Sequence, residues 1–424
     1  MIAAFLLQAA IAGPPALTAA ERDMATARIA TLMRERFYDS ARADTCVRPI
    51  LAAGRYDGLT RPEAFAGALT RDLAGCGDRH LRVAFEPEAA PPPQTRTGQP
   101  APSDDLAAQY RRRNYDFREL RRLEGNVGYL RLYTFAPARL GGDAAASAMR
   151  FLSTSDAVII DLRGNRGGYP DMGLLIASWF FARSTHYANV YRRSGDRTEQ
   201  QWTLPYLPGP RLAEQPLYIL VGRDSFSGAE SLAYNLQQLH RAVIVGERTG
   251  GGATGGNTVR VDSRFTIFIS DVNFTSPASG ANWEGGGVVP DIAAGYDDAL
   301  TVAHRAALAR LAERTADAAE RQEYRWAAEM VAARAAPPPA ASELAGLAGT
   351  YGTRVVTSEG GRLHYRNGEN SLFPMLRVGD AWMLDGEPTV RFRFVRGRGG
   401  HVERLVGTYA DGSTIEAPRT GNTP

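Results

Sequence analysis

The chain has 424 residues, 44% hydrophobic and 22% charged, which is the composition of a folded globular protein with room for about two or three domains. The formal net charge is only +3, so nothing in the composition favours nucleic acid or an anionic membrane surface as a partner. All 49 basic residues are Arg, which excludes any site that needs a lysine base, a Schiff-base lysine or a phosphate-loop lysine.

The first residues are apolar and end in an Ala-Ile-Ala triplet at residues 10–12. This triplet is typical of a signal-peptide cleavage site, although no positive side chain precedes the apolar stretch. We therefore expect a secreted or periplasmic protein whose signal peptide, residues 1–12, is removed after Ala12; a buried N-terminal helix is the alternative. No later segment has the roughly 18 to 20 consecutive apolar residues of a membrane-spanning helix.

Helical patterns follow up to residue 73. Thr18 with Glu21 has the spacing of a capping box before a helix that reaches about residue 38. Thr60 with Glu63 has the same spacing before a second helix through residue 73. These patterns predict an N-terminal helical subdomain over residues 13–85.

The sequence contains two cysteines, Cys46 and Cys76. An even number in a secreted chain allows one disulfide, which we prefer to two buried free thiols. No CxxC motif or other cluster with metal-ligand spacing occurs, and we expect neither a metal nor a cofactor.

Residues 86–108 are rich in Pro, Ala, Thr and Gln and predict a linker. After it, apolar β-rich runs alternate with helical patterns, which predicts βαβ units and a mainly parallel sheet in an α/β core over residues 109–336. The expected buried strands are residues 127–132, 157–161, 217–221 and 243–246. A long helical region over 297–335 ends at three prolines, and short strands with turn signals over 342–420 predict a small all-β, barrel-like domain.

A glycine-rich turn, DLRGNRGG, occupies residues 161–168 directly after a buried strand. Loops at the carboxyl ends of parallel strands are where α/β proteins build their sites, and glycines let backbone N–H groups approach an anion. Gly167 and Gly168 are therefore candidate oxyanion donors; a tight turn that needs positive φ is the alternative. Arg163 and Arg166 could bind a peptide carboxylate, although arginines on such turns more often brace the turn.

A second loop, RDSFSGAE at residues 223–230, also follows a buried strand and opens a helix. Ser227 and Glu230 fit an N-cap and capping box, which would explain both residues structurally. A serine at a helix start also has its hydroxyl near the positive end of the helix, with the Gly228 N–H beside it, as a nucleophile and an oxyanion donor require. The surroundings are not G-x-S-x-G, which disfavours a nucleophile elbow of the α/β-hydrolase kind.

Two further glycine-rich segments follow. Residues 250–255 satisfy G-x-G-x-x-G, but the next residues have a strand pattern, so we reject a dinucleotide site. Glu284 lies in NWEGGGVVPD at residues 282–291, beside a tryptophan; a single glutamate on a loop is usually solvated.

As a set, DLRGN-x-GG, S-x-S-x-A-E, VGE-x-T-GGG and NWEG-x-GVVPD occur here in an order that resembles peptidase family S41, the tail-specific or C-terminal processing peptidases. More closely, the chain resembles the branch that contains the tricorn core protease and the interphotoreceptor retinoid-binding protein repeats. The resemblance covers about residues 18–310. It implies a crotonase-like (ClpP/crotonase-type) α/β core with the helical subdomain before it and the all-β domain after it.

The resemblance also implies roles for individual residues. It places the catalytic serine three residues before the Glu of S-x-A-E, which is Ser227. The processing-peptidase branch has a lysine where this chain has Gly252, so that dyad is absent here. The tricorn-like branch instead implies a Ser-His-Glu arrangement, whose histidine matches His80 in Asp-Arg-His and whose glutamate matches Glu284.

Of the six histidines, His80 is the one that follows a glycine-rich turn and matches the family position. The others are expected in a polar strand, at a helix end, inside the late helix and in the C-terminal domain: His186, His240, His304, His364 and His401.

The resemblance therefore implies a serine-type peptidase that acts on a peptide or protein. In it, His80 takes the Ser227 proton, Glu284 orients His80 directly or through another hydroxyl, and backbone N–H groups of Gly228 and of Gly167 or Gly168 bind the oxyanion. The alternatives are a non-catalytic binding protein for hydrophobic ligands or peptides on the same fold, and an esterase.

Overall fold

The computed structural model describes residues 15–87 and 104–421. The expected signal peptide, residues 1–12, and most of the expected linker lie outside these residues. The chain divides into two compact units that cut across the expected domain ranges. The first unit comprises Met1–Leu106, Thr185–Trp202 and Gly250–Val288, and the second comprises Ala107–Ser184, Thr203–Thr249 and Val289–Pro424.

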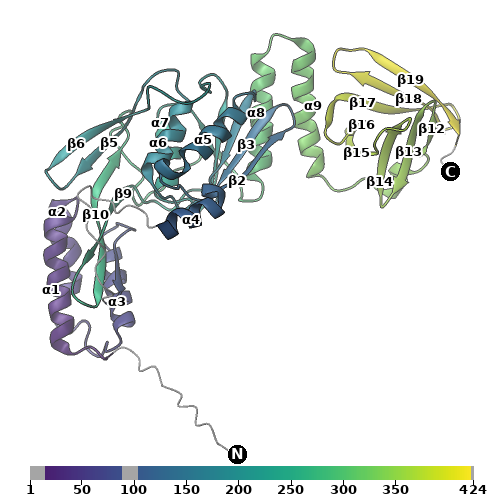
Figure 1. The fold of residues 1–424 in the computed structure, drawn as a ribbon. Helices are drawn as coiled ribbons and strands as arrows, with labels where there is room; N and C mark the ends of the chain where they lie inside the picture. The colour runs from purple at the N-terminus through teal and green to yellow at the C-terminus, as the bar shows by residue number, and fades with distance from the viewer. Residues whose placement is uncertain (1–14, 88–103, 422–424) are drawn as a thin grey trace, which may run out of the picture. The chain divides into compact units, whose positions relative to one another are not determined.

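In the first unit, helices pack against an antiparallel sheet (Figure 1). The helices are α1 (Ala19–Arg36), α2 (Ser40–Val47) and α3 (Pro62–Ala74), with a short 3-10 turn at Pro49–Leu51. The strand order is β1 (Arg82–Phe85), β10 (Phe265–Thr275), β5 (His186–Arg192) and β6 (Arg197–Trp202), with β9 (Thr254–Arg260) paired to β10.

The predicted helices of residues 13–85 are present, but they share their core with strands from later in the chain. Phe265, Ile267 and Ile269 alternate along one face of β10 and pack among the buried side chains of the helices. The capping box predicted at Thr18 is formed, since Thr18 and Glu21 exchange hydrogen bonds. The capping box expected at Thr60 is not formed, since α3 has Arg61 as its N-cap and no side chain caps it. Pro62 occupies the first turn instead, a position that suits proline because its missing N–H would have no partner there.

The second unit is built on a mainly parallel sheet. This sheet contains the four strands expected from the sequence, and each has the expected bounds. The order is β11 (Ile292–Ala293), β8 (Val243–Gly246), β7 (Leu217–Val221), β4 (Ala157–Asp161), β3 (Val127–Leu132) and β2 (Phe117–Leu123), parallel except for β2. The helices of this part are α4 (Asp104–Arg112), α5 (Ala138–Leu152), α6 (Pro170–Trp179) and α7 (Gly228–Gln238), with a 3-10 turn at Asn114–Asp116.

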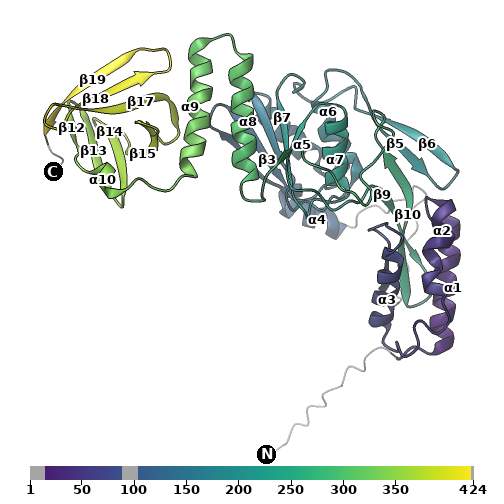
Figure 2. The same ribbon diagram turned by 180° about the vertical axis from the view of Figure 1, so that it is seen from behind.

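The long helical region expected at 297–335 consists of two helices, α8 (Ala299–Arg314) and α9 (Ala318–Arg334), which lie side by side in Figures 1 and 2. Asp317 separates them and caps α9, since its carboxylate accepts the N–H groups of Ala319 and Glu320. Apolar side chains of α8 and α9 cover buried residues of the parallel sheet.

After the short helix α10 (Ala341–Leu344), the C-terminal residues form a closed barrel, as the turn signals predicted. Its interior is filled by side chains such as Tyr351, Trp382 and Phe392. The strands are β12 (Gly349–Tyr351), β13 (Arg354–Glu359), β14 (Arg362–Asn367), β15 (Phe373–Val378), β16 (Ala381–Leu384), β17 (Glu387–Arg396), β18 (Val402–Tyr409) and β19 (Thr414–Gly421).

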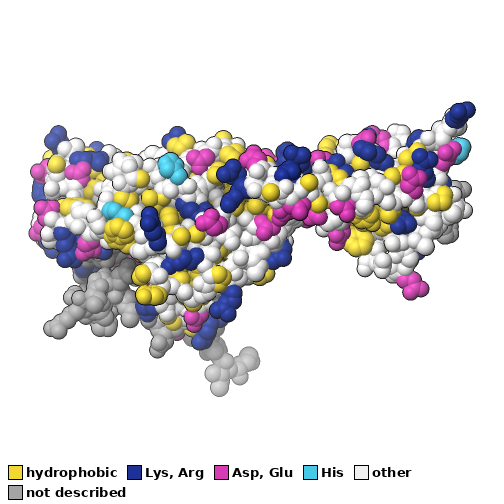
Figure 3. Space-filling model, turned by 90° about the horizontal axis from the view of Figure 1, so that it is seen from above, with side chains coloured by type: hydrophobic (Ala, Val, Ile, Leu, Met, Phe, Trp, Pro, Cys, Tyr) yellow, Lys and Arg dark blue, Asp and Glu magenta, His cyan; other side chains and the backbone are white. Residues whose placement is uncertain are grey.

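Arg and acidic side chains are interspersed on the face shown in Figure 3, in line with the small net charge. Within residues 15–87 and 104–421, none of the helices combines the length and the apolarity needed to cross a membrane.

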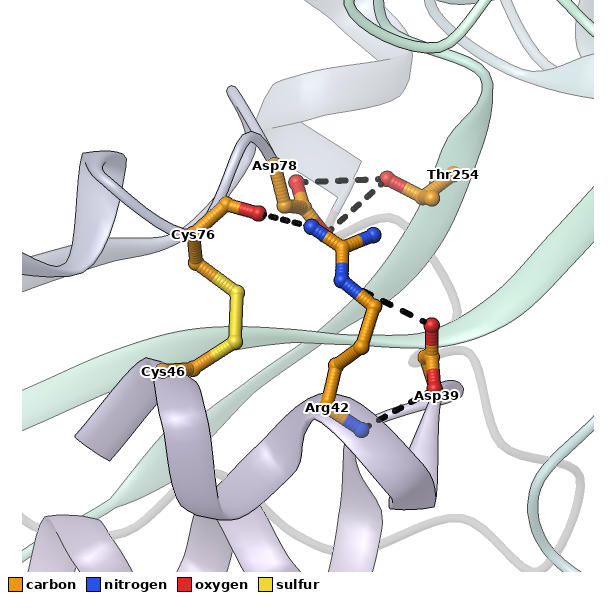
Figure 4. Close-up of a disulfide and its surroundings, with 6 residues drawn as sticks. All are labelled: Asp39, Arg42, Cys46, Cys76, Asp78 and Thr254. Carbon is orange, nitrogen blue, oxygen red and sulfur yellow. Dashed lines mark hydrogen bonds and ion pairs between the residues drawn. A yellow bond between two sulfur atoms is a disulfide. The ribbon is translucent and has the colours of Figure 1, made fainter. Parts of the chain in front are cut away.

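The two cysteines form a disulfide that joins α2 to the loop after α3 (Figure 4). Because the bridge closes a loop over a sequence separation of 30 residues, it restricts the unfolded chain, and the loop-entropy model gives about 3–4 kcal/mol of stabilisation.

We predict that the double variant Cys46→Ala, Cys76→Ala lowers the free energy of unfolding of this unit by about 2–4 kcal/mol, because the unfolded chain regains the freedom that the disulfide removes. The loss of two buried side chains adds to this effect. Urea titration followed by circular dichroism measures the loss. A reductant should destabilise the wild type to a similar extent and leave the double variant unchanged; equal stability of all four samples would contradict the prediction.

Candidate active site

Ser227 lies between β7 and α7 in an unusual backbone conformation. Its φ is 52° and its ψ is −116°, a positive φ that residues other than glycine rarely adopt. Its N–H donates to Glu230 Oε2 at 2.8 Å, and the fully buried Glu230 also accepts the Thr249 hydroxyl. The Ser227 side chain makes no capping hydrogen bond to the helix. Helix capping therefore accounts for Glu230 but leaves the partly exposed Ser227 hydroxyl for another role.

Three glycines meet beside Ser227. A Cβ on Gly167 would lie 2.6 Å from the Gly228 nitrogen, and a Cβ on Gly228 would lie 3.4 Å from the Gly168 nitrogen. The Gly167 N–H already donates to Asn165 Oδ1 at 2.8 Å, and the Asn165 carbonyl accepts the Phe226 N–H at 3.0 Å. Asn165 thus ties the glycine-rich turn to the serine loop, and it leaves Gly168 rather than Gly167 as a donor for a ligand.

Gly168 is fixed by Phe135. The Tyr169 N–H donates to the Phe135 carbonyl and the Phe135 N–H donates to the Gly167 carbonyl, at 3.0 and 2.9 Å. A Cβ on Gly168 would lie 2.3 Å from the Phe135 oxygen, and its φ is 133°, so a side chain is excluded here both by space and by conformation.

The two arginines of the turn have different contacts. Arg163 binds Asp161 through Nε at 3.0 Å and through Nη2 at 2.7 Å, and it also donates to the Tyr296 carbonyl. Arg166 forms an exposed ion pair with Asp224 at 3.3 Å. For Arg163 the structure confirms the bracing role.

His80 lies in the first unit, on the loop between α3 and β1, with 14% of its side chain exposed. Its Nδ1 is 3.1 Å from Thr254 Oγ1. The buried Asp78 accepts the His80 backbone N–H at 2.8 Å, and its Oδ1 lies 3.9 Å from Nδ1. Burial lowers the pKa of His80 below its ordinary value because it penalises the charged ring, while the charge of Asp78 opposes this shift.

Glu284 also lies in the first unit, where it holds the loop before β9. Its Oε2 accepts the Ala253 N–H at 2.5 Å, and the neighbouring Trp283 donates from its indole to the Gly252 carbonyl at 2.9 Å. Glu284 is therefore bonded next to Thr254, the residue whose hydroxyl contacts His80. Burial, followed by the charges of Glu284 and Asp78, raises the pKa of Tyr38 to about 12, so both carboxylates lie near that ring.

The structure thus brings together Ser227, Gly228, Gly167 and Gly168 in one unit, and His80 and Glu284 in the other. No sequence pattern singles out Thr254, because its contact with His80 joins segments 174 residues apart in the chain. Asp78 does carry a local signal, since an Asp two residues before a histidine indicates a carboxylate partner.

Three other histidines have structural surroundings. His304 Nε2 lies 2.8 Å from the Glu124 carbonyl. His186 stacks on Trp202 with ring centroids 5.0 Å apart, and His240 follows the C-cap of α7 with a φ of 53°. Among the residues that the structure describes, no group of His, Cys, Asp and Glu side chains is arranged to hold a metal ion.

Part of the chain is similar to known proteins. Residues 126–294 match the model of peptidase family S41. A carboxyl-terminal-processing protease of Synechocystis sp. is 34% identical over 126 residues, covering 30% of this chain and 28% of that protein. A carboxy-terminal-processing protease of Bartonella bacilliformis is 26% identical over 175 residues, covering 40% and 39%. The chain therefore spans well under half the length of these curated relatives.

Among solved structures, a putative peptidase from Parabacteroides merdae aligns over 64% of this chain and 89% of that chain, with 17% identity and a TM-score of 0.45. A TM-score of this size does not define a shared fold.

The matched region contains Ser227, the three glycines and Glu284, whereas His80 precedes it. Over residues 126–294, this chain is similar to peptidase family S41 and to carboxyl-terminal-processing proteases.

Proposed function

We propose that this protein is a serine-type peptidase in which Ser227 is the nucleophile, His80 is the general base and Glu284 supports the base. The observation that supports this most strongly is the backbone of Ser227, held at a φ of 52° at the start of α7 with glycine backbones packed against it. Strain of this kind is concentrated at functional sites, and the side chain takes no part in capping.

The chemistry follows from the residue types. His80 Nε2 takes the proton of Ser227 Oγ as that oxygen attacks the peptide carbonyl carbon. The N–H groups of Gly228 and Gly168 stabilise the oxyanion, and each such donor typically contributes about 3 kcal/mol to the transition state. His80 then returns the proton to the leaving amine as the C–N bond breaks, and water hydrolyses the acyl-enzyme by the reverse proton transfers.

In this proposal, Glu284 acts on His80 indirectly, by holding the loop that carries Thr254. Since it bonds to Ala253, it orients the following Thr254, whose hydroxyl contacts His80. This corresponds to a glutamate that acts on the histidine through another hydroxyl.

The proposal includes a crotonase-like core for the second unit, which the parallel order from β11 to β3 and the family match support. It also includes a secreted or periplasmic location and a peptide or protein substrate. The Cys46–Cys76 disulfide supports the location, because disulfides persist in oxidising compartments.

Ser227→Ala should reduce kcat for hydrolysis of labelled casein by about 10⁶-fold, to background, because no other group replaces the nucleophile. The matched control is Ser231→Ala, one turn further along the same helix, which should keep most of the activity. A fluorophosphonate probe should label the wild type and the control but not Ser227→Ala.

Two outcomes would contradict the proposal. Wild-type hydrolysis of casein by Ser227→Ala would exclude this nucleophile. Hydrolysis of esters without hydrolysis of any peptide would make the protein an esterase, and the absence of both activities would indicate a binding protein.

The pH dependence of kcat/KM follows from the protonation of His80. A general base must be neutral, and burial lowers the pKa of His80 below 6.5. We predict that kcat/KM is lost as the pH falls through this lowered pKa and is level above it, with the midpoint below about 6.5. A pH–rate profile between about pH 4 and 8 measures the midpoint, and a midpoint above about 7 would contradict a buried histidine as the base.

A further inference from the structure

We propose that Asp78 and Thr254 form a positioning pair that fixes the orientation and the tautomer of His80. In this pair the His80 Nδ1–H donates to Thr254 Oγ1, and the Thr254 hydroxyl donates to the Asp78 carboxylate. The catalytic meaning of the pair rests on the proposed function, whereas its geometry does not.

The three side chains lie in one compact unit and contact one another directly. Thr254 Oγ1 is 3.1 Å from His80 Nδ1 and 3.3 and 3.4 Å from the two carboxylate oxygens of Asp78. Asp78 and Thr254 are 2% and 3% exposed, so water does not screen these contacts. Figure 4 shows Asp78 and the Thr254 hydroxyl facing each other from different segments of the chain.

The hydrogen positions follow from the donors that each group has. A carboxylate only accepts, and a threonine hydroxyl donates once and can accept twice. A neutral histidine carries one ring proton, and a base that acts through Nε2 must carry it on Nδ1. These conditions give the order Nδ1–H to Thr254 and Thr254 O–H to Asp78. The buried Ser270 hydroxyl, 3.1 Å from Thr254 Oγ1, fits the second acceptor position of Thr254.

The Asp78 side of the pair is held rigidly. Asp78 accepts the His80 backbone N–H at 2.8 Å, which closes a short turn around the base. Two residues earlier, Cys76 is bonded to Cys46 of α2, and Arg42 of the same helix donates to the Cys76 carbonyl (Figure 4). Because the loop is anchored on both sides of Asp78, its carboxylate cannot turn away without breaking several contacts.

The two nearby carboxylates have different contacts and therefore different roles. Asp78 Oδ1 lies 3.9 Å from the His80 ring nitrogen, close enough for its charge to stabilise the imidazolium formed during catalysis. Glu284 bonds to the backbone of the loop that carries Thr254.

The other titratable groups around this cluster include Tyr38, Arg42 and Asp39, besides Glu284 itself. The pKa of Tyr38 is about 12, so Tyr38 stays neutral near pH 7 and keeps its proton in the range where His80 titrates. These groups are the same in every variant, so a shift in the His80 titration on substitution of Asp78 or Thr254 reports on the pair.

The test compares Thr254→Val, which keeps the shape and removes the hydroxyl, with Thr254→Ser, which keeps the hydroxyl. We expect Thr254→Val to lose about 10- to 100-fold in kcat with KM unchanged, which is part of the 10²–10⁴ that a positioned base supplies. Thr254→Ser should stay within about threefold of the wild type. Thr258→Val, at an exposed position of the same strand, is the control for the strand itself.

Asp78→Asn is the second variant, since an amide oxygen can still accept the His80 N–H while the charge is removed. It should move the midpoint of the kcat/KM profile to lower pH, because the Asp78 charge raises the pKa of His80. If circular dichroism shows that Thr254→Val does not fold, the pH midpoint of Asp78→Asn tests the pair by itself.

A readout that needs no activity separates this inference from the proposed function. In the full chain labelled with ¹⁵N-histidine, His80 should have its proton on Nδ1 in the wild type and shift toward Nε2–H in Thr254→Val. A wild-type proton on Nε2, or an unchanged tautomer and pH midpoint in both Thr254→Val and Asp78→Asn, would overturn the pair. If no protein hydrolyses peptides but the tautomer responds, the peptidase proposal fails and the positioning pair stands.

Discussion

The hydrogen bond from the Ser227 N–H to the buried Glu230 carboxylate holds the conformation on which the Ser227 loop depends. A residue other than glycine at positive φ costs about 1–3 kcal/mol. A hydrogen bond to a charged acceptor contributes about 1.5–3 kcal/mol, so this single bond can offset the strain. The second bond to Glu230, from Thr249, keeps the carboxylate from being buried with one oxygen unsatisfied. The serine hydroxyl is then released from helix capping, and Gly228 can approach Gly168.

The absence of lysine sets the second constraint. A lysine base must lose its proton near neutral pH, which requires a large drop in its pKa, whereas histidine needs only a small one. The surroundings of His80 supply a shift in that direction through burial. Asp78 works against the shift, yet a carboxylate at 3.9 Å favours the charged ring that the proposed mechanism forms when the serine proton moves. The balance between these two effects decides how basic His80 is at rest and how stable its charged form becomes.

The parts of this structure that the sequence predicted are those with local signals. The strands at 157–161 and 217–221 contain the continuous apolar runs that are typical of a buried parallel strand, and their bounds are confirmed. The barrel followed from repeated turn residues. The antiparallel sheet of the first unit could not be predicted in the same way, because β10 pairs with β1 and β9 across long separations and its partners depend on register. The contact of the Phe226 N–H with the Asn165 carbonyl and the contact of Thr254 with Asp78 are also tertiary, and no spacing in the sequence predicts them.

The family match divides the candidate site in an informative way. Residues 126–294 contain Ser227, the three glycines beside it and Glu284, while His80 and Asp78 lie before this region. The geometry at Ser227 comes from loops at the carboxyl ends of β4 and β7, where the parallel sheet fixes the backbone. The geometry at His80 comes from a loop held by the disulfide, by Asp78 and by the β9 hydroxyl of Thr254. Because separate structural elements hold the two groups, the proposed use of histidine in place of lysine as the base places its demands on the surroundings of His80 and none on the Ser227 loop.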